Sequence, residues 1–300
     1  MLRIYGLTKR YKRFPVLKGL NMSLDRGDVY GFLGTNGCGK TTTMNIICNV
    51  IDKDYGEIVF DSEDCKIGYL PEAPSLHGYM NGCEYLDYIG ACCRYEGDIK
   101  ARTAEVLEIT GMTSGAERLI KGYSRGMNQR IGIAAALYSK PDLLILDEPT
   151  SALDPAGRAE VMEIIRRLAQ SGATIILCTH ILADVERVAN KIGILRDGVM
   201  AIEGTLSQVR AQFEPSSVIS VRLRQYTPEI VNALTDIDIV ERGEFYDYIG
   251  VLLFAKEGVS EKALYQSVVV RLAEKDVLPE GIEFRRLTLE QIYMNVTGGF

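Results

Sequence analysis

Residues 34–42 read GTNGCGKTT and constrain the fold of this chain more than any other stretch of its sequence. The stretch fits the pattern G-x-x-x-x-G-K-[ST], with an apolar run, VYGFL, before it and a helix-like run, TTMNIICN, after it. In a strand–loop–helix context, such glycines let backbone N–H groups and the positive end of the helix converge on an anion. We therefore predict a loop that binds nucleotide phosphates, formed by Gly34, Thr35, Asn36, Gly37, Cys38, Gly39, Lys40, Thr41 and Thr42.

Three residues of this loop have separate predicted roles. Lys40 supplies a mobile cation for the β- and γ-phosphates. Thr41 places its hydroxyl on Mg²⁺, and Thr42 hydrogen-bonds a phosphate oxygen.

A second apolar run, at residues 143–146, ends in two carboxylates, Asp147 and Glu148. A buried parallel strand would deliver both at its C-terminal end, where ligands bind in open α/β sheets. We predict that Asp147 holds the phosphate-bound Mg²⁺ through water and that Glu148 orients and deprotonates the attacking water. His180 ends the next apolar run, TIILCTH, and is expected to contact the γ-phosphate and so link nucleotide, water and base.

Short apolar runs bounded by glycine or aspartate recur through the first two thirds of the chain, and helical patterns separate several of them. This alternation predicts an α/β fold with a largely parallel sheet covered on both faces. Residues 81–140 lack strand patterns and are expected to form a helical insertion. The predicted strands are residues 29–33, 67–70, 143–146, 174–178 and 191–196, with an amphipathic helix at 156–170 and a hairpin at Asp197-Gly198.

The sequence pattern changes near residues 213–217, FEPSS, and we predict a domain boundary there, between 1–215 and 216–300. The order expected in the second part is strand 218–224, helix 228–234, strands 238–241 and 248–255, helix 260–274 and strand 282–287. That order is compatible with a small α+β, ferredoxin-like unit.

Composition narrows the possible partners. A net charge of -6 and a pI near 5.2 argue against a nucleic-acid binder, which usually presents a basic face. The seven cysteines form no C-x-x-C pair, which favours reduced thiols over a zinc site or disulfides. No apolar run approaches the roughly 18 residues of a membrane helix, so we expect any work at a membrane to depend on a partner.

The segments GTNGCGKTT, LLILDEP, SALDP and CTH occur in this order, with a helical stretch between the first two. The combination resembles the ATPase subunit of ABC transporters over residues 1–215. The resemblance implies a P-loop NTPase core of ABC type with a helical subdomain at about 81–140, ATP and Mg²⁺ as cofactors, and ATP hydrolysis. It also implies a head-to-tail dimer, in which each ATP lies between one subunit's phosphate loop and the other's signature segment.

The stretch YSRGMNQR at residues 123–130 is similar to that signature segment, whose usual form is Leu-Ser-Gly-Gly-Gln. Ser124 can cap the following helix and donate to a γ-phosphate, while Gly126 lets the backbone approach closely. Tyr123, Arg125 and Met127 depart from the usual form, but the two positions with phosphate chemistry are kept.

Glu72, in YLPE, is a further departure, because the family commonly has glutamine there in contact with Mg²⁺ and the lytic water. Glutamate can still ligate magnesium, but a carboxylate near the γ-phosphate would slow hydrolysis. GYLPE, YSRGM and the closing RRLTLEQIYMNVTGG resemble ATPases of the ABC-2 exporter type, the bacitracin- and daunorubicin-resistance-like group. By the same resemblance Tyr11 stacks on adenine, with Phe14 as the alternative, and residues 75–94 form a groove for a permease helix.

The resemblance favours the ATP-hydrolysing motor of an exporter, with a polytopic permease on a separate chain. We expect a homodimer or a heterodimer with another ABC ATPase, in the cytoplasm and peripheral at the inner face of the membrane. One alternative is a soluble ABC-type ATPase that acts on a non-transport complex; the single cassette and the lack of a long heptad insertion argue against it. Another is a nucleotide switch without turnover, against which the presence of Glu148 and Ser124 argues.

Overall fold

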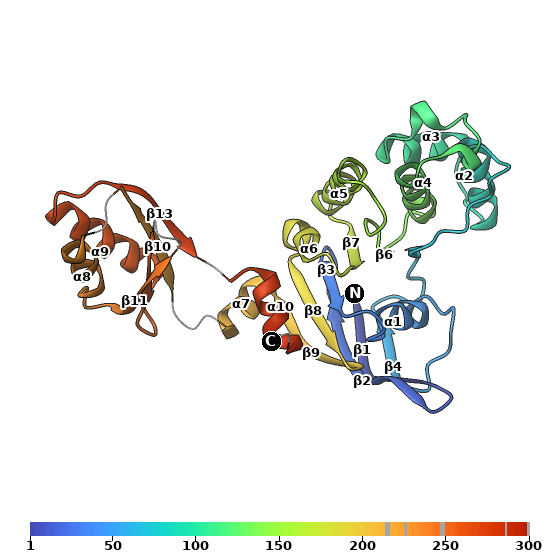
Figure 1. The fold of residues 1–300 in the computed structure, drawn as a ribbon. Helices are drawn as coiled ribbons and strands as arrows, with labels where there is room; N and C mark the ends of the chain where they lie inside the picture. Colours follow the sequence, from blue (N-terminus) through green and yellow to red (C-terminus); the bar gives the residue numbers. More distant parts are fainter. Residues whose placement is uncertain (214–216, 225–226, 247–249, 286, 299–300) are drawn as a thin grey trace. The chain divides into compact units, whose positions relative to one another are not determined.

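The computed structural model describes residues 1–213, 217–224, 227–246, 250–285 and 287–298. They pack as two compact units (Figure 1), one formed by Met1–Leu206 with the residues from Tyr293 onward and the other by Ser207–Ile292. The boundary expected between residues 215 and 216 lies outside the described residues and stays a prediction.

A six-stranded sheet forms the centre of the first unit, and its order is β5-β6-β7-β3-β8-β9. Every residue of β3, β6 and β7 is buried, which explains why these strands read as continuous apolar runs. The first five strands are parallel, and β9 joins through the predicted hairpin at Asp197-Gly198, where both residues have positive φ. The bounds are β3 (Val29–Gly34), β5 (Ile67–Leu70), β6 (Leu143–Asp147), β7 (Thr174–Cys178), β8 (Lys191–Arg196) and β9 (Val199–Thr205).

Helices α1 (Lys40–Ile47), α5 (Pro155–Gln170) and α6 (Leu182–Val188) follow strands of this sheet, and α7 (Leu206–Phe213) follows β9. Helix α5 agrees closely with the helix predicted at 156–170. It begins after Asp154, whose side chain accepts a hydrogen bond of 3.1 Å from the backbone N–H of Gly157. Its buried face carries Val161 and Ile165, because apolar residues recur there at helical spacing.

A three-stranded antiparallel sheet, β2-β1-β4, is a feature that the sequence analysis missed. Its strands are β1 (Leu2–Tyr11), β2 (Phe14–Leu24) and β4 (Tyr55–Phe60). A signal was present, since Leu20, Met22 and Leu24 alternate with more exposed residues along β2, as a half-buried strand requires. These side chains share one core cluster with Tyr30 and Phe32 of β3.

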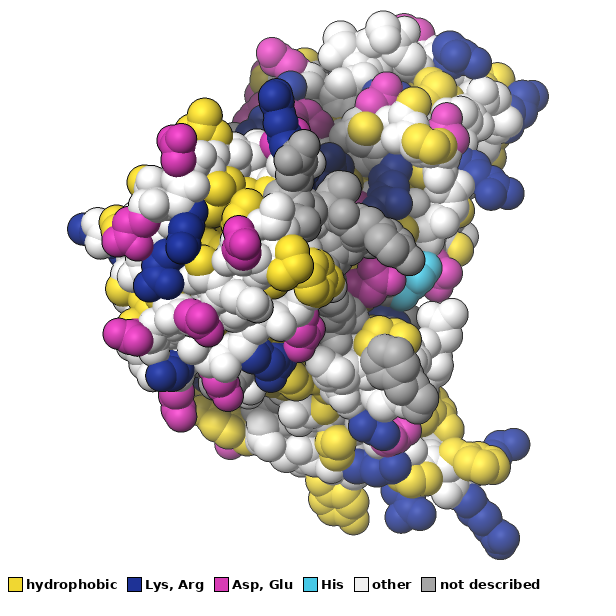
Figure 2. Space-filling view, turned by 60° about the vertical axis from the view of Figure 1, so that its left-hand side comes forward, with side chains coloured by type: hydrophobic (Ala, Val, Ile, Leu, Met, Phe, Trp, Pro, Cys, Tyr) yellow, Lys and Arg dark blue, Asp and Glu magenta, His cyan; other side chains and the backbone are white. Residues whose placement is uncertain are grey.

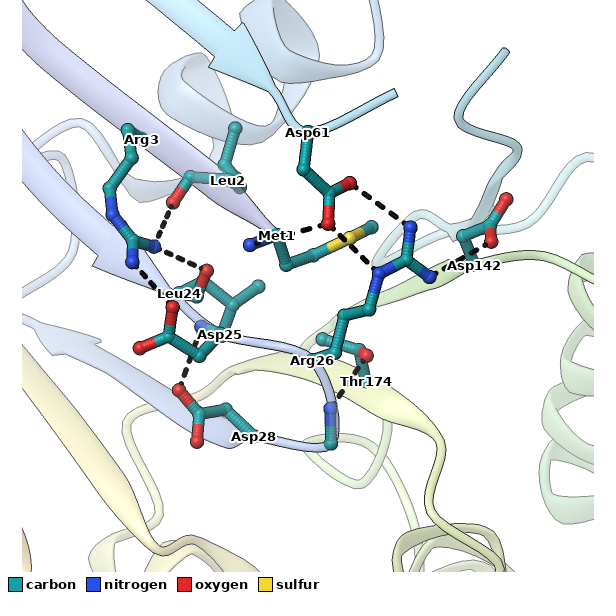
Figure 3. Close-up of polar contacts among 11 residues, drawn as sticks. Met1, Leu2, Arg3, Leu24, Asp25, Arg26, Asp28, Asp61, Asp142 and Thr174 are labelled. Atoms are coloured by element: carbon teal, nitrogen blue, oxygen red, sulfur yellow. Dashed lines mark hydrogen bonds and ion pairs between the residues drawn. The ribbon is translucent and has the colours of Figure 1, made fainter. Parts of the chain in front are cut away.

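Arg26 links this sheet to the starts of the parallel strands (Figure 3). It donates to both carboxylate oxygens of Asp61 at 2.9 and 3.0 Å, and to Asp142 at 3.4 Å. Asp61 follows β4 and Asp142 directly precedes β6, while the neighbouring Gly27 donates its N–H to Thr174 at the start of β7. The contacts therefore bind the two sheets together at the edge opposite the C-terminal ends of the parallel strands.

The segment expected to be helical contains α2 (Gly82–Cys92), α3 (Ile99–Ile109) and α4 (Arg125–Leu137), with short 3₁₀ turns at Thr113–Gly115 and Ile120–Gly122. Each α-helix starts at a polar cap. Asn81 and Glu84 form a reciprocal capping box at α2, and Asp98 accepts from the N–H of Ala101 at α3. Ser124 caps α4.

The second unit has the predicted order of strands and helices. Its four strands pair antiparallel in the order β11-β12-β10-β13, and both helices contribute to a core that includes Ile219, Val221, Leu253, Leu264 and Val268. The predicted strand residues 248–249 and 286 lie outside the described part of the chain, and the ferredoxin-like assignment stays a prediction. The bounds are β10 (Val218–Leu223), α8 (Pro228–Thr235), β11 (Val240–Tyr246), β12 (Gly250–Ala255), α9 (Glu261–Glu274) and β13 (Pro279–Arg285), followed by α10 (Leu289–Thr297).

Charged side chains and free thiols complete the description of the surface and the cysteines. Acidic and basic side chains are interspersed on the face shown in Figure 2. All seven cysteines have free thiols. Across the described ranges, no helix is long and apolar enough to span a bilayer.

Candidate active site

A pocket of about 400 Å³ lies at the C-terminal ends of β3, β6 and β7, where the topology predicts a ligand site. It gathers residues from the phosphate loop, from the segment after β5 and from the ends of β6 and β7. Its lining residues are Val16, Asn36, Gly37, Gly39, Lys40, Thr41, Thr42, Glu72, Asp147, Glu148 and His180.

The phosphate loop leads directly into α1, so the N-terminal N–H groups of the helix face the pocket. Gly39, the residue before the helix, has φ of +115°, and an added Cβ would lie 2.7 Å from Cδ2 of Leu17. Only glycine fits there without strain. The buried Lys40 ammonium donates to the carbonyl oxygens of Gly34 at 2.8 Å and Thr35 at 3.3 Å, so the loop itself holds this cation at the pocket.

Asp147 ends β6 with its carboxylate buried, and Thr41 donates its hydroxyl to Asp147 Oδ2 at 2.9 Å. The other oxygen, Oδ1, is buried and has no hydrogen-bond partner among the described residues. Burial raises the pKa of Asp147 above its ordinary value, and the carboxylates of Glu148 and Glu72 act in the same direction. The Thr41 hydroxyl and the Lys40 charge oppose this shift without cancelling it.

This donor set fits a hard divalent cation. An orphaned carboxylate oxygen beside a threonine hydroxyl offers the oxygen ligands that Mg²⁺ prefers, and three carboxylates give the site an excess of negative charge. Among the described residues, no cluster of three or more His, Cys, Asp or Glu side chains could hold a metal ion by itself. Mg²⁺ is commonly bound by one or two carboxylates together with substrate phosphates and water, and the pocket beside the phosphate loop has room for both.

Glu148 follows Asp147 with a strained backbone, since its φ is +49° and it is not glycine. Such a conformation costs about 1–2 kcal/mol and persists only where the surrounding contacts hold it. The N–H of Glu148 donates to the carbonyl oxygen of Cys178 in β7 at 2.8 Å. Ser151 donates its hydroxyl to the Glu148 carbonyl at 3.2 Å, so the backbone on both sides of Glu148 is fixed.

His180 and Thr179, at the end of β7, hold the Glu148 carboxylate. Nδ1 of His180 lies 3.0 Å from Oε1 and 2.9 Å from Oε2, and the Thr179 hydroxyl donates to Oε2 at 3.3 Å. An ionised carboxylate only accepts hydrogen bonds, so a hydrogen bond from His180 to it requires a proton on Nδ1. The role of Thr179 was missed by the sequence analysis, since no pattern marks it.

Some of the residues predicted to bind the nucleotide do not line the pocket. Gly34, Thr35 and Cys38 are not among the lining residues, and the side chain of Cys38 is buried in the core cluster beside β3. Tyr11, at the end of β1, is 46% exposed and pairs with Phe14 across the strand turn. Neither ring lines the pocket; Val16 of β2 does, and no sequence signal distinguished it.

Ser124 and Gly126 lie at the start of α4 and do not line the pocket of their own chain. Ser124 Oγ accepts from the N–H of Met127 at 3.2 Å. An added Cβ on Gly126 would lie 3.8 Å from Cα of Gly157, so α4 and α5 approach closely at their starts.

A phosphate loop after β3, with two carboxylates at the end of β6 on the other side of β7, is typical of a P-loop ATPase. Residues 17–151 match the family model described as ABC transporter. The chain is 31% identical to the daunorubicin resistance ATP-binding protein DrrA3 of Streptomyces coeruleorubidus, over 99% of this chain and 96% of that protein. It is 29% identical to the linearmycin resistance ATP-binding protein LnrL of Bacillus subtilis (strain 168), over 99% of this chain and 98% of that protein.

A solved structure agrees with these sequence comparisons. A dimeric, post-hydrolysis state of the ATP-binding cassette MJ0796 bound to ADP and Pi superposes with a TM-score of 0.62 and 26% identity, covering 69% of this chain and 99% of that one. The chain belongs to the ABC transporter ATP-binding proteins. It is an ATP-binding and ATP-hydrolysing subunit, and the expected ABC-type P-loop fold is confirmed.

Proposed function

We propose that Glu148 is the general base of ATP hydrolysis in this subunit. The observation that carries the proposal is its position: the carboxylate lies in the phosphate-loop pocket, one residue after Asp147, and is held by His180 and Thr179. A carboxylate held at the pocket can orient a water molecule for attack and accept its proton. His180, which lines the same pocket, then fixes the base through Nδ1 and contacts the γ-phosphate.

Thr41, Asp147 and Glu72 are the residues that would hold Mg²⁺. The bound cation would neutralise developing charge on the phosphates. Lys40 and the N–H groups of residues 36–42 bind and orient the phosphates. Glu72 adds a negative charge where glutamine is usual, and we expect it to slow turnover rather than prevent it.

Ser124 and Gly126 serve the nucleotide of a second subunit. Neither residue lines the pocket of its own chain, which supports this proposal, because a capped helix start favours anions. The second subunit is a copy of this chain or another ABC ATPase, paired head to tail. Tyr11 or Phe14 stacks on the adenine ring.

The motor drives an exporter whose polytopic permease is a separate chain, so the subunit works in the cytoplasm at the inner face of the membrane. Full-length relatives named for linearmycin and daunorubicin resistance support export over import. The groove at residues 75–94 is proposed to receive the permease. There the ring centroid of His77 lies 5.6 Å from that of Tyr79 and 5.4 Å from that of Tyr88. Both tyrosines are exposed and offer aromatic surface to a partner.

Affinity capture tests the proposal. Tagged Glu148→Gln protein, held with ATP and Mg²⁺, is recovered from detergent-solubilised membranes and from cytosol in parallel, with Glu57→Gln as an exposed control. Recovery of a polytopic membrane protein, increased in the Glu148→Gln variant, is expected. Recovery only from cytosol with an assembly complex would favour the soluble ABC-type ATPase instead.

A further inference from the structure

Asp184, on α6, is a buried carboxylate with no role in the site described above; it is 1% exposed. Its Oδ2 accepts the hydroxyl of Thr150 at 2.7 Å. Its Oδ1 accepts two hydrogen bonds from Arg158, one from Nε at 2.9 Å and one from Nη2 at 2.8 Å. Burial of a carboxylate is costly unless it is paired and hydrogen-bonded, and here both oxygens are engaged.

Thr150 joins this carboxylate to the proposed base. It lies two residues after Glu148 and is itself 2% exposed. The intervening residue is Pro149, which narrows the backbone freedom between them. Fixing the Thr150 side chain therefore fixes the downstream end of the segment in which Glu148 has its left-handed backbone.

Arg158 joins the same carboxylate to α5, and α6 itself follows closely after His180. The Asp184 side chain thus connects three segments near the pocket: the loop after Glu148, the first turns of α5, and α6, the helix after His180. Glu148 and His180 contact each other directly at the pocket. Behind them, Asp184 connects the segments that follow the two residues.

We propose that Asp184 is a positioning residue for ATP hydrolysis: through Thr150 it holds Glu148 in the geometry that activates the attacking water. The inference rests on the proposed role of Glu148 as base. Asp184 does not line the pocket, so it acts on turnover and not on nucleotide affinity.

The test compares two threonine–aspartate hydrogen bonds of equal length in the full chain, the one at Thr150 buried and the one at Thr103 partly buried. Thr150→Val removes the Thr150–Asp184 bond but leaves the Arg158 ion pair. Thr103→Val removes the bond from Thr103 to Asp87, also 2.7 Å, together with a 3.0 Å hydrogen bond between the Thr103 and Tyr138 hydroxyls, in the helical segment away from the pocket. Thr150→Ser restores the hydroxyl without the methyl group.

Steady-state ATPase kinetics and thermal unfolding are measured for each variant. We expect Thr150→Val to lower kcat at least tenfold with KM for ATP within twofold of the original chain, and Thr150→Ser to recover most of the lost kcat. Thr103→Val should lower the melting temperature by a similar amount and leave kcat unchanged.

Two results would overturn the inference: retention of kcat in Thr150→Val, or equal loss of kcat in Thr150→Val and Thr103→Val. Glu148→Gln is measured alongside to separate the two proposals. If Glu148→Gln retains turnover, the role of Glu148 as base is wrong and the inference falls with it. If Glu148→Gln loses turnover and Thr150→Val retains it, only the role of Asp184 is wrong.

Discussion

Nδ1 of His180 lies 3.0 Å from Oε1 of Glu148, although 32 residues separate the two in the chain. The contact exists because β6 and β7 are parallel neighbours, so that their C-terminal ends meet at one edge of the sheet. Parallel pairing thereby brings two distant strand ends together in one carboxylate–imidazole contact.

Glu148→Gln should lower the ATPase rate by about 10²–10⁴-fold, because an amide orients water but cannot accept its proton. Nucleotide affinity should stay within a few-fold, since the phosphate loop is unchanged. Phosphate release and equilibrium binding of a fluorescent ATP analogue measure the two quantities. Glu57→Gln, on an exposed position of β4, is the control and should leave both unchanged.

Gly39→Ala should lower the free energy of unfolding and weaken nucleotide binding. The substitution forces an L side chain into a left-handed backbone, at about 1–2 kcal/mol, and adds a clash with Leu17. Gly37→Ala isolates the first effect, because φ there is +80° but an added Cβ meets nothing within 4 Å. Denaturant unfolding should give Gly39→Ala a lower free energy of unfolding than Gly37→Ala. Equal free energies for the two variants would show that the clash with Leu17 costs nothing.

The thiols should differ in reactivity. Burial raises the pKa of Cys48 to about 12 and that of Cys178 well above its ordinary value, so neither forms appreciable thiolate at pH 8. Cys92 and Cys93 are exposed. After brief iodoacetamide treatment at pH 8, mass spectrometry should find label on Cys92 and Cys93 first, and label on Cys48 and Cys178 only after much longer exposure. The urea-unfolded chain, in which all seven should react, is the control.

Ser124→Ala should weaken ATP-dependent dimerisation while leaving ATP binding to the monomer intact, since Ser124 does not line its own pocket. The loss of the α4 cap should also cost about 1 kcal/mol of stability. Light scattering after size exclusion, in the Glu148→Gln background with ATP, measures the dimer. Ser124→Asn keeps the cap chemistry, so a dimer lost in both variants points to the phosphate contact and a dimer lost only in Ser124→Ala points to the cap.

Local patterns in the sequence were sufficient for the parallel strands, the helix at 156–170, the hairpin at Asp197-Gly198 and the phosphate loop. Each depends on residues close together in the chain: continuous burial, helical spacing, or glycines that permit positive φ. The carboxylates Asp147 and Glu148 were predicted for the same reason, because a buried strand that ends abruptly in acidic residues is itself a local signal.

Contacts between distant segments were decided only by the tertiary structure. Three such features are the hydrogen bond from Thr179 to Glu148, the place of Val16 in the pocket, and the contacts of Asp184 with Thr150 and Arg158. Each joins elements that are far apart in the chain, and no local sequence pattern marks the partners. The N-terminal sheet was missed because the alternation of buried and exposed residues holds over only part of β1 and β2. The sequence by itself therefore determined the candidate residues for phosphate and proton chemistry, while the packing of parallel strands decided which side chains hold them in place.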